Sequence, residues 1–190
     1  MMESNNLEFW HSVEKTNPKY TKKANVRGNN ITAIAPQSQI KQATEKFGIY
    51  GKAWGFNKIE INTDLKEFGL VTFTGQFFYP NGTFPICSSI SLWRDNAQTK
   101  VDADFAKKLE TDALTKALSK LGFNADIFMG LYDDNEYVAE LQEEFKEKVT
   151  VVKGDATWLK IVDRKAPLAT VLVHYQLSSE NQTEYLNLIK

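Results

Sequence analysis

The sequence is poor in the residue types on which thiol and metal chemistry depend. It has a single cysteine, Cys87, and only two histidines, His11 and His174, in 190 residues. One cysteine cannot form a disulfide within the chain, which is typical of proteins in a reducing cytosol. So few histidines argue against a histidine-rich metal site or a catalytic triad. We therefore expect a cytoplasmic protein without a bound metal.

The sequence also lacks the long apolar stretches of membrane proteins. No apolar run approaches the roughly 18 residues that a membrane helix needs. Residues 1–10 are polar, include Glu3 and Glu8, and lack the basic-then-apolar order of a signal peptide. These absences predict a protein that neither enters a membrane nor is secreted.

Motifs of the common enzyme classes are missing as well. A phosphate-binding P-loop ends in Gly-Lys-Ser/Thr, but here Gly51 and Lys52 are followed by Ala53. No nucleophile elbow and no paired-cysteine metal motif occurs. We expect no catalytic residues, no cofactor and no ATP site.

Three aspartates could be read as metal ligands of a nuclease, but each has a simpler structural explanation. Asp102 and Asp104 precede a predicted helix, where the positive end of the helix dipole stabilises carboxylates. Asp112 lies four residues before Lys116, so the two can pair on one helix face. The structural explanation is the stronger prediction.

The near-neutral composition hides a segregation of charge. The 23 Lys and Arg nearly balance the 24 Asp and Glu, and the formal net charge is -1. Between residues 15 and 58, however, Glu45 is the only acid beside nine basic residues. Residues 131–150 show the reverse, with seven acids and two lysines. Such a basic front region suits a protein that neutralises nucleic-acid phosphates.

Hydrophobic periodicity predicts an α+β fold. Pro36 is well placed to start a helix that ends at Gly48. Three β-branched and aromatic segments follow, and residues 80–82 (Pro-Asn-Gly) form a hairpin signal between the last two. A long helix with one apolar arc comes next. The expected bounds are 37–47 for the first helix, 54–61, 70–79 and 83–93 for the strands, and 102–121 for the long helix. We expect an antiparallel meander of three to four strands packed on the long helix, a β-β-β-α core.

The flanking regions are less regular. Residues 1–34 predict a basic N-terminal arm with a short helix near residues 8–15. After the long helix we expect a turn at 124–129 and a helix at 135–148, which Asp133 and Asp134 would cap. The predicted domains are a core with the basic N-terminal arm at 1–148, a linker at 149–156 and a small helical region at 157–190. A capping box from Ser179 to Gln182 would start the last helix.

Two stretches resemble the Rad-fifty-two-like superfamily of single-strand annealing proteins. Residues 43–56 (ATEKFGIYGKAWGF) are similar to its helix-to-strand entry. Residues 111–122 (TDALTKALSKLG) are similar to its helix that begins Thr-Asp and ends at Gly. The order of meander, hairpin turn and long helix also agrees, and the resemblance covers about residues 20–142. The short chain resembles the phage members of the superfamily.

The resemblance implies an ATP-independent protein, not an enzyme, that binds single-stranded DNA and anneals complementary strands in recombination and repair. Members assemble into rings or helical filaments, in which a groove holds the sugar-phosphate backbone. The resemblance places DNA-binding cations at Lys116, close to Lys120, at Arg27 and near Lys100. The implied partners are single-stranded DNA and further copies of the chain, in the cytoplasm of a host cell. The C-terminal region is a candidate contact for a host single-strand binding protein.

Composition adds further candidates, because binding of single strands calls for cations along a groove and for platforms under the bases. The full set of candidate DNA-binding residues is Lys22, Lys23, Arg27, Lys52, Trp54, Arg94, Lys100, Lys108, Lys116 and Lys120. Each lysine can instead be a solvated surface residue, and Trp54 and Trp93 can instead pack in the core. Cys87 is expected to be a small packed side chain.

Three other functions stay open at this point. A metal-dependent nuclease would shorten single strands, and a plain protective binder would coat them and slow their pairing. A protein-interaction scaffold would have no affinity for DNA.

Overall fold

The computed structural model describes residues 7–26, 28–95 and 97–189 and shows an α+β protein, as the periodicity predicts. Contacts divide the chain into two compact units, Met1–Gln142 and Glu143–Lys190. The boundary therefore comes earlier than the expected end of the core at residue 148. None of the helices in the described ranges has both the length and the apolar character needed to cross a membrane.

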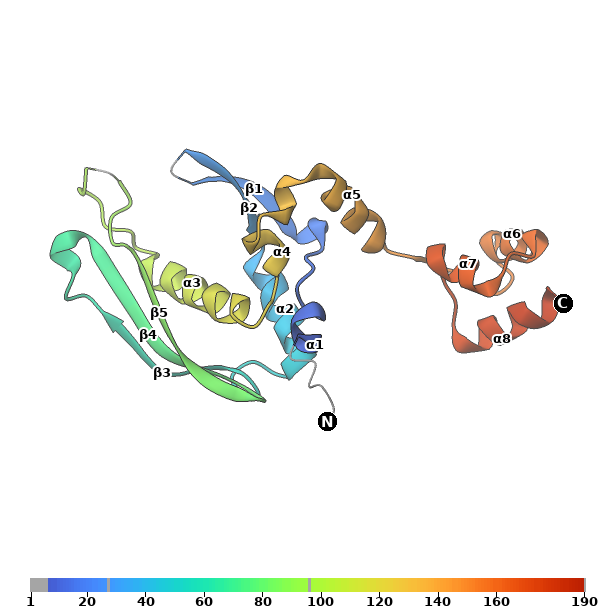
Figure 1. Cartoon of the computed structure of the whole chain (residues 1–190), viewed down its shortest axis with the longest axis horizontal. Helices are drawn as coiled ribbons and strands as arrows, with labels where there is room; N and C mark the ends of the chain where they lie inside the picture. Colours follow the sequence, from blue (N-terminus) through green and yellow to red (C-terminus); the bar gives the residue numbers. More distant parts are fainter. Residues whose placement is uncertain (1–6, 27, 96, 190) are drawn as a thin grey trace. The chain divides into compact units, whose positions relative to one another are not determined.

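The first unit contains a three-stranded antiparallel sheet of order β3-β4-β5 (Figure 1). Its strands are β3 (Gly55–Asn62), β4 (Leu70–Tyr79) and β5 (Gly82–Ser91), with a short 3-10 helix η2 (Lys66–Phe68) between the first two. Tyr79 pairs with Gly82, so Pro80 and Asn81 alone make the turn. Gly82 has φ +158°, a backbone conformation that L side chains rarely adopt, so glycine is favoured directly after the turn.

Alternating burial along β4 and β5 gives the sheet a mainly apolar inner face and a mainly polar outer face. Val71, Phe73 and Ile86 are each at most 1% exposed and form the inner face. The opposite face carries small polar side chains such as Thr74 and Ser89. Cys87 lies on this outer face and is exposed, so the expectation of a packed thiol is wrong. The cause is the period of two, which turns Cys87 outward between Ile86 and Ser88.

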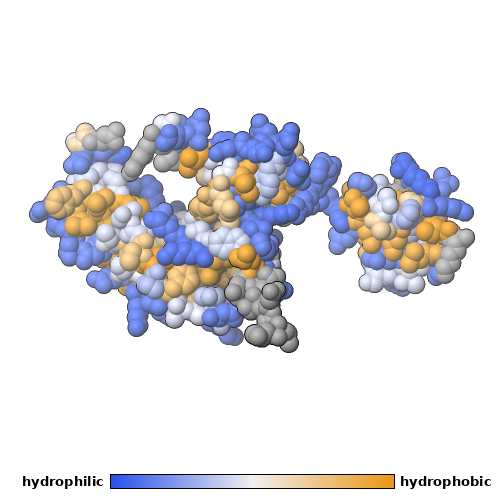
Figure 2. All heavy atoms as spheres, in the orientation of Figure 1, coloured by the Kyte–Doolittle hydropathy of each residue, from blue (hydrophilic) through white to orange (hydrophobic). Residues whose placement is uncertain are grey.

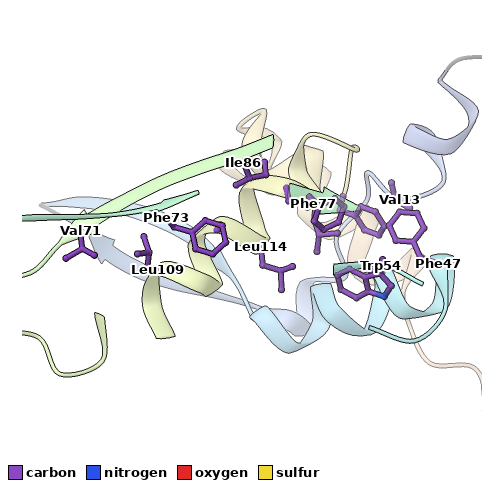
Figure 3. Close-up of a cluster of buried hydrophobic side chains, with 14 residues drawn as sticks. Val13, Phe47, Trp54, Val71, Phe73, Phe77, Ile86, Leu109 and Leu114 are labelled. Carbon is purple, nitrogen blue, oxygen red and sulfur yellow. The ribbon is translucent and has the colours of Figure 1, made fainter. Parts of the chain in front are cut away.

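The long helix α3 (Phe105–Ser119) supplies the other half of the core. Leu109, Ala113 and Leu118 are fully buried and belong to one cluster with the inner face of the sheet (Figure 3). Four-residue spacing places Leu109 and Ala113 on one helix face. Small alanines on this face let the helix backbone approach the aromatic rings of the sheet.

Two further helices extend the same core. Helix α2 (Pro36–Phe47) starts with Pro36 and ends at Gly48, whose φ of +99° favours glycine. Phe47 of α2 stacks on Phe9 of the short helix α1 (Glu8–His11) and meets Phe123 edge-on, at centroid distances of 5.5 Å in both pairs. These rings tie the start of the chain to the residues that follow α3.

The expected N-terminal arm is instead largely a β-hairpin. Strands β1 (Thr21–Val26) and β2 (Asn29–Ile34) pair in register after a 3-10 helix η1 (Pro18–Tyr20). The sequence did not predict these strands, because neither face of the hairpin is fully buried and the strands therefore need no alternation of apolar residues. A two-stranded hairpin is marginally stable alone and depends on packing against its neighbours.

After α3 the chain forms α4 (Ala125–Phe128), η3 (Leu131–Asp133) and α5 (Asn135–Glu144). Asp134 caps α5 as predicted, because its side chain accepts a 2.8 Å hydrogen bond from the Glu136 N–H. The helix ends at Glu144, short of the predicted Lys148. Glu143 and Glu144 at its C-terminal end are unfavourable for the helix dipole.

The second unit has its own small core. Its elements are β6 (Val149–Thr150), α6 (Ala156–Arg164), α7 (Leu168–His174), β7 (Tyr175–Gln176) and α8 (Ser179–Leu188). The apolar cluster consists of Val151, Trp158, Ile161, Val171, Leu177 and Tyr185.

Two local predictions for the second unit are wrong. The expected linker at 149–156 is part of the unit, because β6 pairs with β7 and Val151 is 2% exposed. The cap of α8 is Ser178 rather than Ser179, since the Ser178 hydroxyl accepts the Asn181 N–H at 3.2 Å. A serine at either position fits a capping pattern, and only the backbone geometry selects one.

Candidate nucleic-acid interface

A groove of about 560 Å³ lies between the N-terminal hairpin and α3 in the first unit. We call it the hairpin groove. Four elements form its walls: β2 with Ile31, Thr32, Ala33 and Ile34, α2 with Pro36, α3 with Lys107, Lys108, Thr111, Asp112 and Thr115, and α4 with Ile127 and Phe128. Figure 1 shows the hairpin standing across from α3, and Figure 2 shows the hollow between them. The groove combines an apolar lining with lysine side chains.

Lysines along α3 follow a four-residue step. Lys108, Asp112, Lys116 and Lys120 each lie one helical turn from the next, about 6 Å along the axis. The row therefore extends over roughly 18 Å from Lys108 to Lys120. One carboxylate interrupts the three cations.

Lys116 is engaged by two neighbours. Its ammonium forms a 2.8 Å ion pair with Asp112 and donates a 3.0 Å hydrogen bond to the Ser88 hydroxyl of β5. Ser88 in turn donates to Asp112. The sequence predicts the Lys116–Asp112 pair, whereas Ser88 comes from the sheet packing. Lys116 is 48% exposed, so a phosphate can reach it but has to compete with Asp112.

Lys108 is engaged in a similar way at the start of α3. Its ammonium lies 2.5 Å from Asp102, whose side chain is only 12% exposed. The hydrogen bond from Lys108 lowers the pKa of Asp102, and the nearby Arg94 contributes to the same shift. Arg94 is thus brought close to the Lys108 end of the row.

The loop that carries Lys100 is shaped by Asp95. The Asp95 carboxylate accepts hydrogen bonds from the Thr99 hydroxyl at 2.5 Å and from the Lys100 N–H at 3.0 Å. These bonds lower the pKa of Asp95. The Arg94 N–H donates to the Lys100 carbonyl at 2.9 Å, so both cations belong to one turn. Lys100 is exposed.

Two hairpin cations lie on β1. Lys22 and Lys23 are exposed, and the Lys23 ammonium donates a 2.9 Å hydrogen bond to the hydroxyl of Thr32, which lines the groove. Lys23 therefore lies beside the groove. Arg27 lies outside the described residues.

Lys52 and Lys120 are grouped at the other end of the sheet. Lys52 is in the turn just before β3, whose first residue, Gly55, pairs with Phe78. The Lys120 ammonium lies 5.9 Å from the centroid of the Phe84 ring on β5. Arg94 follows β5 at the end where Leu70 pairs with Ser91. About eight residues of β4 separate the two ends, roughly 26 Å. The predicted cations along the three-stranded sheet thus form two groups, one at each end, with Lys116 between them, while Lys22 and Lys23 lie on the hairpin.

Trp54 packs in the core, which is one of the two environments that the sequence left open for it, and it offers no exposed platform to a base. It is 0% exposed, and its indole N–H donates to the Gly48 carbonyl at 2.9 Å. Its ring packs against Phe47 and Tyr50. Burial of the whole ring removes more apolar surface from water than stacking on a base would.

A buried polar network fixes α4 beside the groove. Asp126 is 2% exposed and accepts hydrogen bonds from the Thr16 N–H at 2.7 Å and from the Thr16 hydroxyl at 2.6 Å. Asn124, in the left-handed region at φ +58°, donates to the same hydroxyl and accepts from Gln39 of α2. Gln39 accepts in turn from Thr115 of α3. The network joins four segments around the inner end of the groove.

Sequence reasoning missed Lys107 and Phe128. Both line the groove, and Phe128 is 53% exposed. No hydrogen bond or ion pair engages the Lys107 ammonium within the described ranges, unlike those of Lys108 and Lys116. The only sequence signal was the Lys-Lys pair at 107–108. Phe128 gave none, because a single aromatic in a short turn is more often packed.

Similarity to known proteins does not identify the site. The chain matches no protein-family profile and no curated protein sequence. Within the described part of the chain, no three His, Cys, Asp or Glu side chains gather in a way that could hold a metal ion.

Proposed function

We propose that the chain binds single-stranded DNA in the hairpin groove and anneals complementary strands without ATP, as an oligomer of the Rad-fifty-two-like type. The hairpin groove carries the proposal. Lysines of α3 and apolar side chains of β2 and α4 line it together, which is the combination that single-strand binding needs. The succession of β3, β4, β5 and α3 supports the β-β-β-α core that belongs to this proposal.

Phosphate neutralisation supplies the binding. Lys107, Lys108 and Lys116 displace counterions from the strand, so affinity falls as salt rises. Contacts with the backbone carry no sequence information, which suits a protein that anneals any complementary pair. Neutralised phosphates also repel the incoming strand less.

Base pairing itself drives annealing. Each paired step contributes on the order of 1.4 kcal/mol of stacking, so no nucleotide hydrolysis is needed. One protomer offers few cations, and a long strand therefore needs several protomers side by side. In a recombination or repair reaction, such an assembly would hold one strand extended until its complement arrives.

The proposal is tested by binding and annealing assays on three proteins: wild type, Lys108→Gln/Lys116→Gln, and Lys41→Gln as a control for the loss of one exposed lysine in an ion pair. Lys41 pairs with Glu45 at 3.8 Å in an exposed i,i+4 pair on α2, much as Lys116 pairs with Asp112. We expect the double variant to bind oligo-dT more weakly and to lose about 0.7 of the salt slope per lost phosphate contact. The control should match the wild type.

Annealing of two complementary oligonucleotides, without ATP and with Mg²⁺ or Mn²⁺, separates the remaining functions. Faster pairing with intact strands is the expected result. Shortened strands would establish a nuclease, and slower pairing a protective binder. Absence of oligo-dT binding at low salt would leave only a protein scaffold.

A further inference from the structure

We propose that Phe128 is a base-stacking residue, whose ring receives the face of a nucleobase from a single strand in the hairpin groove. This inference rests on the proposed function and assigns a contact that phosphate binding alone does not include. It also makes α4 a recognition element rather than a plain connection.

The exposure of Phe128 is the first observation. The ring lines the groove at 53% exposure, although a large apolar side chain is normally stabilised by burial. It belongs to neither buried cluster of the protein. Its neighbour Ile127 lines the same groove, so the apolar surface continues from α4 toward β2.

The backbone beneath Phe128 is held firmly. Asp126, two residues earlier, accepts from Thr16 and from the Ile127 N–H at 2.9 Å while almost fully buried. The Met129 N–H closes the turn on the Ala125 carbonyl at 2.8 Å. The ring is therefore presented by a fixed turn, and little entropy is lost when a ligand stacks on it.

The charges around the groove select the occupant. Lys107 and Lys108 lie on the α3 wall opposite the apolar residues of β2. Among the described residues of the lining, the only acid is Asp112, whose carboxylate is already engaged by Lys116 and Ser88. A polyanion that carries flat apolar groups complements this surface. An apolar segment of a second copy would leave the Lys107 ammonium without an anion.

Stacking is compatible with annealing. A ring that contacts the face of a base leaves the hydrogen-bonding edge of that base open. The lysines hold the neighbouring phosphates, and the complementary strand can still pair. Phe128 would thus orient a base without reading its identity.

The test compares wild type, Phe128→Ala, Phe128→Trp and Phe68→Ala. Phe68 is 74% exposed on η2, so its replacement controls for loss of an exposed ring. Dissociation constants are measured for oligo-dT and for the same oligonucleotide with abasic sites, at several salt concentrations. We expect Phe128→Ala to bind oligo-dT roughly tenfold more weakly with an unchanged salt slope, and Phe128→Trp to keep the affinity.

The abasic strand distinguishes stacking from a structural effect. Wild type should lose affinity for it, whereas Phe128→Ala should bind both strands alike. The inference is wrong if Phe128→Ala matches Phe68→Ala, or if it weakens both strands equally. A change of oligomer size without DNA would assign the groove to a second copy and also overturn it. If wild type binds oligo-dT and anneals strands, such a failure leaves the proposed function intact; if it does not bind, both fail.

Discussion

Asp112 shows how a single residue can set the strength of a cationic site. Its carboxylate holds the Lys116 ammonium at 2.8 Å and accepts from the Ser88 hydroxyl. Lys116 is the residue that the superfamily resemblance assigns to DNA, yet much of its charge is compensated within the protein. Lys107, missed by the sequence pattern, offers an ammonium that no side chain in the described part of the chain compensates. Lysines that look equivalent in the sequence therefore differ in how far their ammonium groups are already paired within the protein, and so in how strongly they can bind a phosphate.

We expect Asp112→Asn to bind single-stranded DNA more tightly than wild type. The asparagine keeps the shape and can still accept from Ser88, but it no longer competes with phosphate for Lys116. Exposed ion pairs contribute up to about 1 kcal/mol, so the gain should be roughly two- to fivefold. Titration of oligo-dT at one fixed salt concentration measures it. Glu45→Gln removes the acid of the Lys41–Glu45 pair on α2 and is the control for net charge. An equal gain in both variants would contradict a local effect.

At the level of elements, caps and turns place the helices more than propensity does. Asp134 starts α5, Ser178 starts α8, and Asp155 starts α6 by accepting the Trp158 N–H at 2.6 Å. The backbone hydrogen bond from Trp158 is the main cause of the lowered pKa of Asp155. A capping carboxylate also interacts favourably with the positive end of the helix dipole.

The lowered pKa of Asp155 predicts a pH-dependent cap. A carboxylate whose pKa is lower in the folded state stabilises that state above its unfolded pKa, which is about 3.9 for aspartate. The stabilisation is lost as pH falls through the lower folded pKa. We expect the difference in unfolding free energy between wild type and Asp155→Asn to shrink between pH 7 and pH 3, since asparagine caps without a charge. Denaturation followed through the NMR signal of the Trp158 indole N–H at both pH values provides the measurement. A difference that does not change with pH would refute the role of the charge.

The whole molecule consists of two units with separate cores. One core joins the sheet to α2 and α3, and the other surrounds Trp158 and Tyr185. A unit of fewer than about 70 residues rarely gains more than about 3–5 kcal/mol from one core. The second unit, Glu143–Lys190, is within that size.

Trp158→Ala should therefore unfold the second unit alone. Loss of a buried tryptophan costs about 3–5 kcal/mol, which is comparable to the whole stability expected there. Two-dimensional NMR of the full chain should show collapsed dispersion for residues 143–190 and unchanged signals for the first unit. Leu159→Ala is the control, because Leu159 is 62% exposed on the same helix. Unfolding of both units together would show that their cores are not independent.

The sequence by itself determined the elements whose periodicity follows from burial. Residues 70–79 alternate because one face of β4 is buried, and the apolar arc of the long helix follows from packing against that face. The Lys116–Asp112 pair was also predictable, because it depends only on the four-residue spacing of a helix. These features are local, so a single stretch of chain contains the whole signal.

Only the tertiary structure decided which side chains meet. Cys87 is exposed against expectation, and Trp54 takes the buried one of its two possible environments, because the sheet register and the turn before β3 set which side of the sheet each residue faces. The hairpin groove brings Ile31, Lys107 and Phe128 together from three elements, and no spacing along the chain connects them. The hairpin itself left no pattern, since its faces are only partly covered. Burial leaves a period in a sequence, whereas an open surface assembled from distant segments does not.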